Sequence, residues 1–205
     1  MSRYCTVLLV ASSLVIGCDS MGTKKDKGAT SGNRNDATSM KSRMNDQAAV
    51  KTAVATIKPS KAATTQPVAN NVMGTITFTQ AGDSMKVAVN LTGLPPNSTH
   101  GFHIHEKSDL SAADLMSAGL HFNPAGHKHG GPNSPMAHAG DFGNITSDAN
   151  GNVNTEMTVK GITLDNSPTG VIGRSVIVHA KVDDLKTDPS GNSGARVAGG
   201  VIEAK

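Results

Sequence analysis

Large aromatic side chains are nearly missing from this chain of 205 residues, which has no tryptophan, one tyrosine and four phenylalanines. A core of packed aromatic rings is therefore excluded, and its volume has to come from valine, isoleucine, leucine, methionine and alanine. Branched aliphatic side chains fit the pleated surface of a sheet, so the composition favours β structure. With so few rings to stack on bases, and no basic stripe, we expect no nucleic-acid partner.

The part of the chain that is expected to fold, residues 47–205, also lacks a net charge. The formal net charge is +3, but residues 47–205 hold twelve Lys and Arg against twelve Asp and Glu. This part is neutral apart from its histidines. Attraction of a charged substrate would therefore have to be local.

Cysteine is confined to the start of the chain, at Cys5 and Cys18, so the body has no disulfide framework. A long hydrophobic run is missing as well. The apolar stretch over residues 6–16 has 11 residues, whereas a transmembrane helix needs about 20. Its length matches the apolar region of a secretory signal.

This stretch ends in Val15-Ile16-Gly17-Cys18, which resembles a bacterial lipobox. The resemblance implies that residues 1–17 are a lipoprotein signal peptide and that Cys18 is lipidated; a plain signal peptide and a short membrane anchor are the alternatives. Residues 19–46 have little apolar surface, so with Cys18 they are predicted to form a flexible tether over residues 18–46. We expect an exported protein, lipid-anchored to a bacterial membrane and facing the periplasm or the cell exterior.

Residues 47–205 alternate between apolar and polar side chains in short segments separated by Gly, Asn and Pro. This pattern predicts an all-β domain, an antiparallel sandwich or barrel. Two stretches, about residues 107–145 and 183–195, are predicted to be irregular, and loops of this length in a compact domain are usually functional. The predicted strands cover residues 52–58, 74–80, 84–91, 153–159, 175–180 and 196–202.

All eight histidines lie between positions 100 and 179. His103 and His105 are two residues apart, so on a strand their rings would share one face while Phe102 and Ile104 would face the core. A set of His and Asp without sulfur suits tetrahedral zinc or tetragonal Cu(II). There are more candidate ligands than one structural site needs, which favours two metals.

The motifs resemble those of the copper/zinc superoxide dismutase family across about residues 51–205. They are GFHIHE (101–106), HFNP (121–124), HGGP (129–132), HAGDFGN (138–144), GRSVIVH (173–179) and GARVA (194–198). The resemblance implies a Greek-key β-sandwich or barrel over residues 47–205 with long metal-binding loops. It also implies disproportionation of superoxide to O₂ and hydrogen peroxide at a copper centre bridged by a histidine to a zinc.

The resemblance further assigns roles to individual residues. His121 would bridge the two metals and take part in catalysis, and Arg196 would guide the anion, helped by the metals and by lysines at the rim. Asp183 resembles the aspartate that hydrogen-bonds one copper and one zinc histidine, with Asp184 as a rival, and His100 resembles a packing position beside the copper strand. The implied copper ligands are His103, His105, His121 and His179, and the implied zinc ligands are His121, His129, His138 and Asp141.

The chain departs from the family at its disulfide, since Leu115 and Gly199 stand at the corresponding positions. The metals, or packing by Leu110, Leu115, Met116 and Leu120, are expected to hold the loop instead. His127 is expected to be exposed. Met136 is expected to pack, and a soft contact to copper is the alternative. Glu203 puts a charge where the family is often apolar, so a monomer and a non-standard dimer both remain open.

Two other functions are possible on such a domain. One is a non-catalytic module for copper or zinc storage or delivery, and the other is a surface adhesion or interaction domain. Storage needs neither a bridging histidine nor an anion guide, so the complete ligand set together with Arg196 favours the enzyme.

Overall fold

The computed structural model describes residues 52–62, 71–132 and 134–205. Gln47–Lys205 forms one compact unit. Residues 1–46, with the predicted signal peptide, Cys18 and the tether, lie outside the described residues. Within the described part, no helix has the length and hydropathy needed to cross a membrane.

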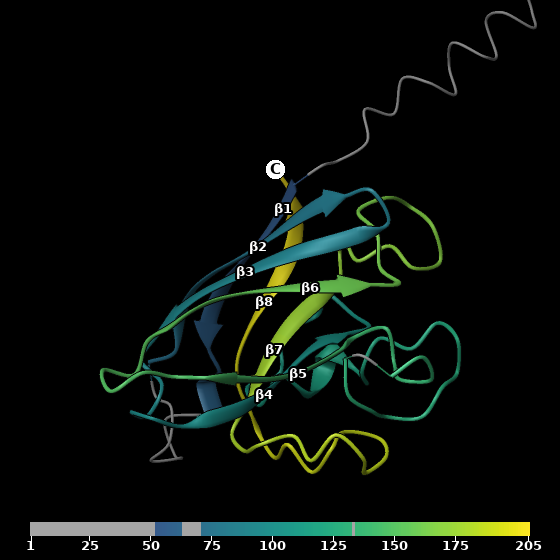
Figure 1. Cartoon of the computed structure of the whole chain (residues 1–205). Coiled ribbons are helices and arrows are strands. Elements are labelled where there is room, and N and C mark those ends of the chain that lie inside the picture. The colour runs from purple at the N-terminus through teal and green to yellow at the C-terminus, as the bar shows by residue number, and fades with distance from the viewer. Residues whose placement is uncertain (1–51, 63–70, 133) are drawn as a thin grey trace, which may run out of the picture. The chain divides into compact units, whose positions relative to one another are not determined.

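Eight antiparallel strands form one continuous sheet in the order β5-β4-β7-β8-β1-β2-β3-β6 (Figure 1). The sheet curls so that its two edge strands, β5 and β6, approach each other and the barrel is nearly closed. The predicted all-β Greek-key fold is confirmed. The strands are β1 (Thr52–Pro59), β2 (Met73–Ala81), β3 (Ser84–Thr92), β4 (Thr99–His105), β5 (Asp141–Thr146), β6 (Val153–Lys160), β7 (Ser175–His179) and β8 (Arg196–Ala204).

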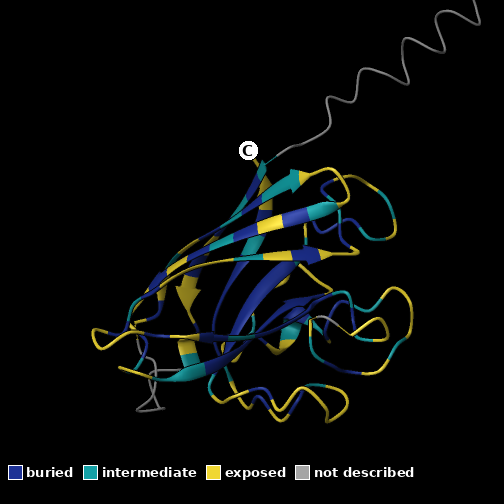
Figure 2. Cartoon of the chain, viewed as in Figure 1, coloured by how far each residue is buried: buried dark blue, intermediate teal, exposed yellow. Residues whose placement is uncertain are grey.

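The alternation in the sequence sets which face of each strand is buried. Ile76 and Phe78 on β2 are 0% exposed, and alternate residues of β3 from Met85 to Leu91 are buried while Lys86 and Asn90 face solvent. Figure 2 shows this alternation as bands of buried and exposed residues along these strands. The core is aliphatic, with few rings, as the composition predicts.

Strand β5 lies inside the stretch that was predicted to be irregular, so that prediction was wrong. Its sequence, DFGNIT, hides the strand because Gly143 takes a positive φ of 74° and polar side chains interrupt the apolar pattern. Its partner β4 shifts register between Gly101 and His103, which brings His103 opposite Asp141. Pairing with β4, rather than local propensity, makes this segment a strand.

Candidate metal centre

Strands β4 and β7 hold three histidines in a rigid part of the sheet. His103 and His105 share one face of β4. Ile104 lies between them and packs in the core, so the two histidine rings point away from the core. Strand β7 runs beside β4 and ends at His179. All three histidines are at most 2% exposed, so their positions are fixed by the sheet and not by solvent-exposed loops.

The long loop after β4 is hydrogen-bonded back onto the end of that strand. The N–H of Phe122 donates to the carbonyl of Ile104 at 2.8 Å, and the N–H of Ile104 donates to the carbonyl of Gly140 at 2.9 Å. Only glycine fits at position 140, because a Cβ there would lie 2.3 Å from the carbonyl oxygen of Ile104. These bonds bring His121 opposite His105.

Four imidazoles converge in a first group, made up of His103, His105, His121 and His179. One nitrogen of each lies within 4.8 Å of all the others. The Nε2 atoms of His105 and His179 are 3.3 Å apart, and Nδ1 of His103 and Nε2 of His121 are buried without a hydrogen-bond partner. Unpartnered buried nitrogens are costly, so the arrangement fits a cation shared by all four rings. Imidazole nitrogens suit copper.

A second group forms around one carboxylate oxygen. Oδ1 of Asp141 lies 2.8, 3.1 and 3.2 Å from Nδ1 of His121, His129 and His138, respectively. Nδ1 of His129 makes no hydrogen bond in spite of this short distance. Three imidazole nitrogens and one carboxylate oxygen are a donor set for tetrahedral zinc. Oδ2 of Asp141 points away and accepts the N–H groups of Gly130 and His138 at 3.0 and 3.1 Å.

His121 belongs to both groups and uses a different nitrogen in each. Its Nδ1 lies 2.8 Å from Oδ1 of Asp141 in the second group, and its Nε2 is buried without a hydrogen-bond partner, which leaves Nε2 for the first group. This is the geometry that a bridging imidazolate requires. A ring ligated at both nitrogens has lost both N–H protons, which the positive charge of two metals makes possible.

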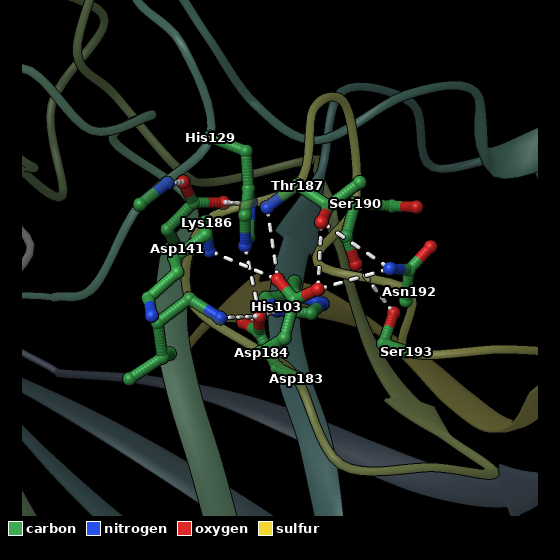
Figure 3. A network of polar contacts seen from close by, with 12 residues as sticks. His103, His129, Asp141, Asp183, Asp184, Lys186, Thr187, Ser190, Asn192 and Ser193 are labelled. Atoms are coloured by element: carbon green, nitrogen blue, oxygen red, sulfur yellow. Dashed lines mark hydrogen bonds and ion pairs between the residues drawn. The ribbon is translucent and has the colours of Figure 1, made fainter.

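Asp183 links His103 of the first group to His129 of the second (Figure 3). Its Oδ2 lies 2.8 Å from Nε2 of His103 and its Oδ1 lies 2.9 Å from Nε2 of His129. The carboxylate accepts a hydrogen bond from the Nε2–H of each ring. The Nδ1 of each ring is then unprotonated and can act as a metal ligand. The rival Asp184 points elsewhere and accepts hydrogen bonds from Thr187 and Asn192.

The first group is electrostatically suited to neutral histidines. Burial lowers the pKa of His121 to about 4, against the opposing effect of Asp141. Burial, followed by neighbouring cationic groups, lowers the pKa of His105 and His179 well below the ordinary value. A neutral imidazole keeps the lone pair that a metal needs.

The second group instead holds a proton when no metal is present. Burial lowers the pKa of His129, but Asp141 and Asp183 together raise it to about 9. Burial raises the pKa of these two carboxyls, but their hydrogen bonds with the histidines hold both well below the usual range. The protonated ring acts as a cation between two carboxylates, a position in which zinc would replace the proton.

A pocket of about 520 Å³ leads to the first group, and Arg196 lies in its wall. The guanidinium donates from Nη1 to the carbonyl of Leu115 at 2.7 Å and from Nη2 to the carbonyl of Gly119 at 2.6 Å. The same Gly119 carbonyl lies 3.0 Å from Nδ1 of His105. Arg196 is thus held beside the copper-type ligands. Among the described residues that line this pocket there is no lysine, so the expected lysine rim is absent from the described wall.

His100 and Ser193 each make a contact that holds His179 in position. Nδ1 of His100 lies 2.8 Å from the carbonyl of His179, and its Nε2 lies 2.7 Å from Oγ of Ser98. Oγ of Ser193 lies 3.1 Å from Nδ1 of His179. The sequence pointed to His100 but not to Ser193, because a serine in a loop carries no metal signal of its own.

An apolar contact occupies the position at which the family has its disulfide. Leu115 is 6% exposed and packs with Ala118 and Ile177, and Leu110 lies partly buried against them. Gly199 makes room for this cluster, since a Cβ there would lie 3.3 Å from Cδ1 of Leu115 and 2.7 Å from Cδ1 of Ile177. Packing of Leu115 was therefore anticipated correctly.

Four other side chains differ from what the sequence suggested. Met116 and Leu120, expected to pack, are 59% and 62% exposed, and Met136, also expected to pack, is 62% exposed. Each stands on a turn or loop, where no neighbouring strand covers it. His127, expected to be exposed, is partly buried, and its Nδ1 lies 3.1 Å from the carbonyl of Ala137.

Known proteins with similar sequences and folds agree with this geometry. The family described as copper/zinc superoxide dismutase (SODC) matches residues 72–202. A copper-zinc superoxide dismutase of Paramecium bursaria Chlorella virus 1 is 41% identical over 137 residues, which are 64% of this chain and 72% of that protein. The crystal structure of the clock protein EA4 has a TM-score of 0.67 and 38% identity, and the match covers 77% of this chain and 96% of that one. The chain belongs to the copper/zinc superoxide dismutase family, and it is an enzyme that disproportionates superoxide with copper and zinc.

Proposed function

We propose that the first group is the copper site and the second group is the zinc site of this dismutase. The copper ligands would be His103, His105, His121 and His179, and the zinc ligands His121, His129, His138 and Asp141. The observation that carries this assignment is His121, whose two ring nitrogens face the two groups separately. Copper, when bound, supplies the one-electron redox chemistry, and zinc supplies a fixed positive charge.

The protein itself orients the substrate and handles the proton. The reaction consumes two superoxide anions and two protons and yields O₂ and hydrogen peroxide. Arg196 is a fixed cation beside the first group, and its remaining N–H groups suit a small anion. Nε2 of His121 has no other hydrogen-bond partner, so it is the atom on which a proton can be held near the reacting anion while Nδ1 stays with the second group.

Metal analysis of the purified chain, combined with a superoxide assay, tests the proposal. We expect one copper and one zinc per chain and rapid turnover. In the His121→Ala variant we expect turnover to be lost and the stoichiometry of at least one metal to fall. Zinc alone, with no turnover after copper loading, would favour the storage or delivery module instead.

We also propose that the enzyme is attached to a bacterial membrane through a lipid on Cys18 and works outside the cytoplasm. The support is the sequence of residues 1–18, which resembles a lipoprotein signal. A Cys18→Ser variant is expected to lose lipid labelling and to leave the membrane fraction. If that variant stays in the membrane fraction, the anchor is of another kind.

A further inference from the structure

The wall of the copper pocket carries two side chains that the dismutation reaction does not explain. Asp114 and Met116 both line the pocket. Asp114 is exposed, and its negative charge opposes the approach of an anion such as superoxide. Met116 is 59% exposed, so it contributes little to packing. Arg196 and Asp114 are the only charged Lys, Arg, Asp or Glu side chains among the described lining residues.

The backbone that carries these two residues is hydrogen-bonded to the wall of the copper pocket. The N–H of Met116 donates to Oδ1 of Asp114 at 3.0 Å. The short 3₁₀ turn η2 (Met116–Ala118) lies between the carbonyls of Leu115 and Gly119, and both carbonyls accept from Arg196. Because the Gly119 carbonyl also contacts His105, the turn is tied directly to the first group.

A carboxylate and a thioether together suit a soft cation better than an anion. Thioether sulfur selects Cu(I), and a nearby negative charge raises the local concentration of cations. Two other methionines, Met73 and Met136, are 50% and 62% exposed, but neither is among the residues that line this pocket. Among the described residues, this combination of donor atoms lines the same pocket as His105, His121 and His179.

We propose that Asp114 and Met116 form a transient binding site for Cu(I) on its way from solvent to the copper ligands. The proposal rests on the assignment of the first group as the copper site. Cu(I) would first contact the Met116 sulfur near the Asp114 carboxylate. It would then pass to the Nε2 atoms of His105 and His179, which lie 3.3 Å apart and line the same pocket. The ion keeps its oxidation state throughout.

The rate of copper uptake tests the role of Met116. Zinc-loaded, copper-free protein is mixed anaerobically with the coloured bicinchoninate complex of Cu(I), and the loss of colour reports uptake. Met116→Leu is expected to take up copper several-fold more slowly than the wild type but to reach the same final copper content. Met136→Leu is the matched control, since it removes an equally exposed methionine outside the pocket, and should match the wild type.

Silver(I), a redox-inert soft cation, gives a second readout that needs no variant. In protein labelled at the methionine methyl groups, the NMR signal of Met116 should shift at lower Ag(I) concentration than those of Met73 and Met136. Equal shifts for all three, or equal uptake rates for the two leucine variants, would overturn the proposal. A wild-type protein that takes up no copper at all would instead overturn the assignment of the copper site itself.

Asp114→Asn tests whether the negative charge of Asp114 attracts Cu(I), because a loss of structure would lower both copper uptake and turnover. Loss of the negative charge should slow Cu(I) uptake and raise kcat/KM for superoxide in the copper-loaded enzyme, each by roughly twofold at low ionic strength. Both effects should shrink as salt screens the charge. A fall in both rates, or no change in either, would contradict the proposal.

Discussion

At the scale of single residues, Asp183 determines which nitrogen two of the histidines offer to a metal. It binds Nε2 of His103 and Nε2 of His129 at 2.8 and 2.9 Å, so each ring must carry its proton there. Its side chain is 0% exposed and its Oδ1 also accepts the N–H of Leu185 at 2.7 Å. One carboxylate thus orients one ligand in each metal group.

Replacement of Asp183 by asparagine should weaken both metal sites. Each ring contacts a different oxygen of the carboxylate, and an amide would replace one of these oxygens by an NH₂ donor, which cannot accept from the N–H of that ring. We expect metal affinity to fall by about 10–100-fold, the usual effect of removing such a partner, as measured by competition with a chromophoric chelator. Asp184→Asn is the control, because the Asp184 carboxylate accepts from Lys186, Thr187 and Asn192 of its own loop and contacts neither ring. If both variants bind metals as tightly as the wild type, Asp183 does not have this role.

At the scale of structural elements, the loop that carries the turn before His121 is held by packing and hydrogen bonds. Leu115 fills the space that Gly199 leaves open. The carbonyl of Ala113 accepts from Oγ of Ser60 at 2.8 Å and from the N–H of Ala62 at 2.9 Å. These contacts join the loop to β8 and to the chain after β1 without a covalent bond.

Leu115→Ala should therefore make the loop more mobile. The guanidinium of Arg196, which is hydrogen-bonded to the loop, should become less well ordered. We expect the free energy of unfolding to fall by about 2–4 kcal/mol, as for other buried leucines. The affinity for azide, a small anion that probes Arg196, should fall in the copper-loaded protein. Leu120→Ala, at a residue 62% exposed, should change stability by less than about 0.5 kcal/mol. Equal stability losses in the two variants would show that Leu115 does not anchor the loop.

The elements also show what the sequence predicts and what it leaves open. Strict alternation, as on β3, predicts both the strand and its buried face, because one face packs on the core. Strand β5 escaped prediction because Gly143 and the polar residues around it obscure the period, and only pairing with β4 makes it a strand. The histidine motifs indicated which residues would meet. Exposure of Met116 and the contact from Ser193 depend on loop conformations that spacing along the chain does not specify.

At the scale of the whole molecule, the stability of the metal-free protein should fall both below and above an optimum pH. Below pH 6.5, unfolded histidines bind protons that the buried ones do not, so stability falls as the pH falls. Between pH 6.5 and about 9, His129 is protonated only in the folded state, so stability falls as the pH rises. The histidines with lowered pKa values are His100, His103, His105, His121 and His179.

Denaturant unfolding of the chelator-treated protein should thus give maximal stability near pH 6.5. Each proton of difference changes the free energy of unfolding by about 1.4 kcal/mol per pH unit. The acid limb should be steeper than the alkaline limb, since several histidines act on it and one on the other. Stability that keeps rising to pH 9 would contradict the raised pKa of His129.

Removal of the metals should destabilise the folded unit strongly, because no disulfide constrains the loops of the body. At a thousandfold excess of free metal over Kd, binding contributes about 4 kcal/mol. For a domain of this size that corresponds to roughly 10 °C in Tm. Calorimetry before and after chelation measures the difference, and a change of only a degree or two would mean that packing alone holds the loops.

The whole two-metal centre requires one imidazole, that of His121, to join two ions. The most direct measurement is the electron paramagnetic resonance signal of Cu(II) in protein that carries Co(II) in place of zinc. Exchange through a shared ring should broaden and greatly weaken the copper signal compared with the copper–zinc protein. A copper signal of full intensity and unchanged shape, with both metals bound at one per chain, would contradict the bridge.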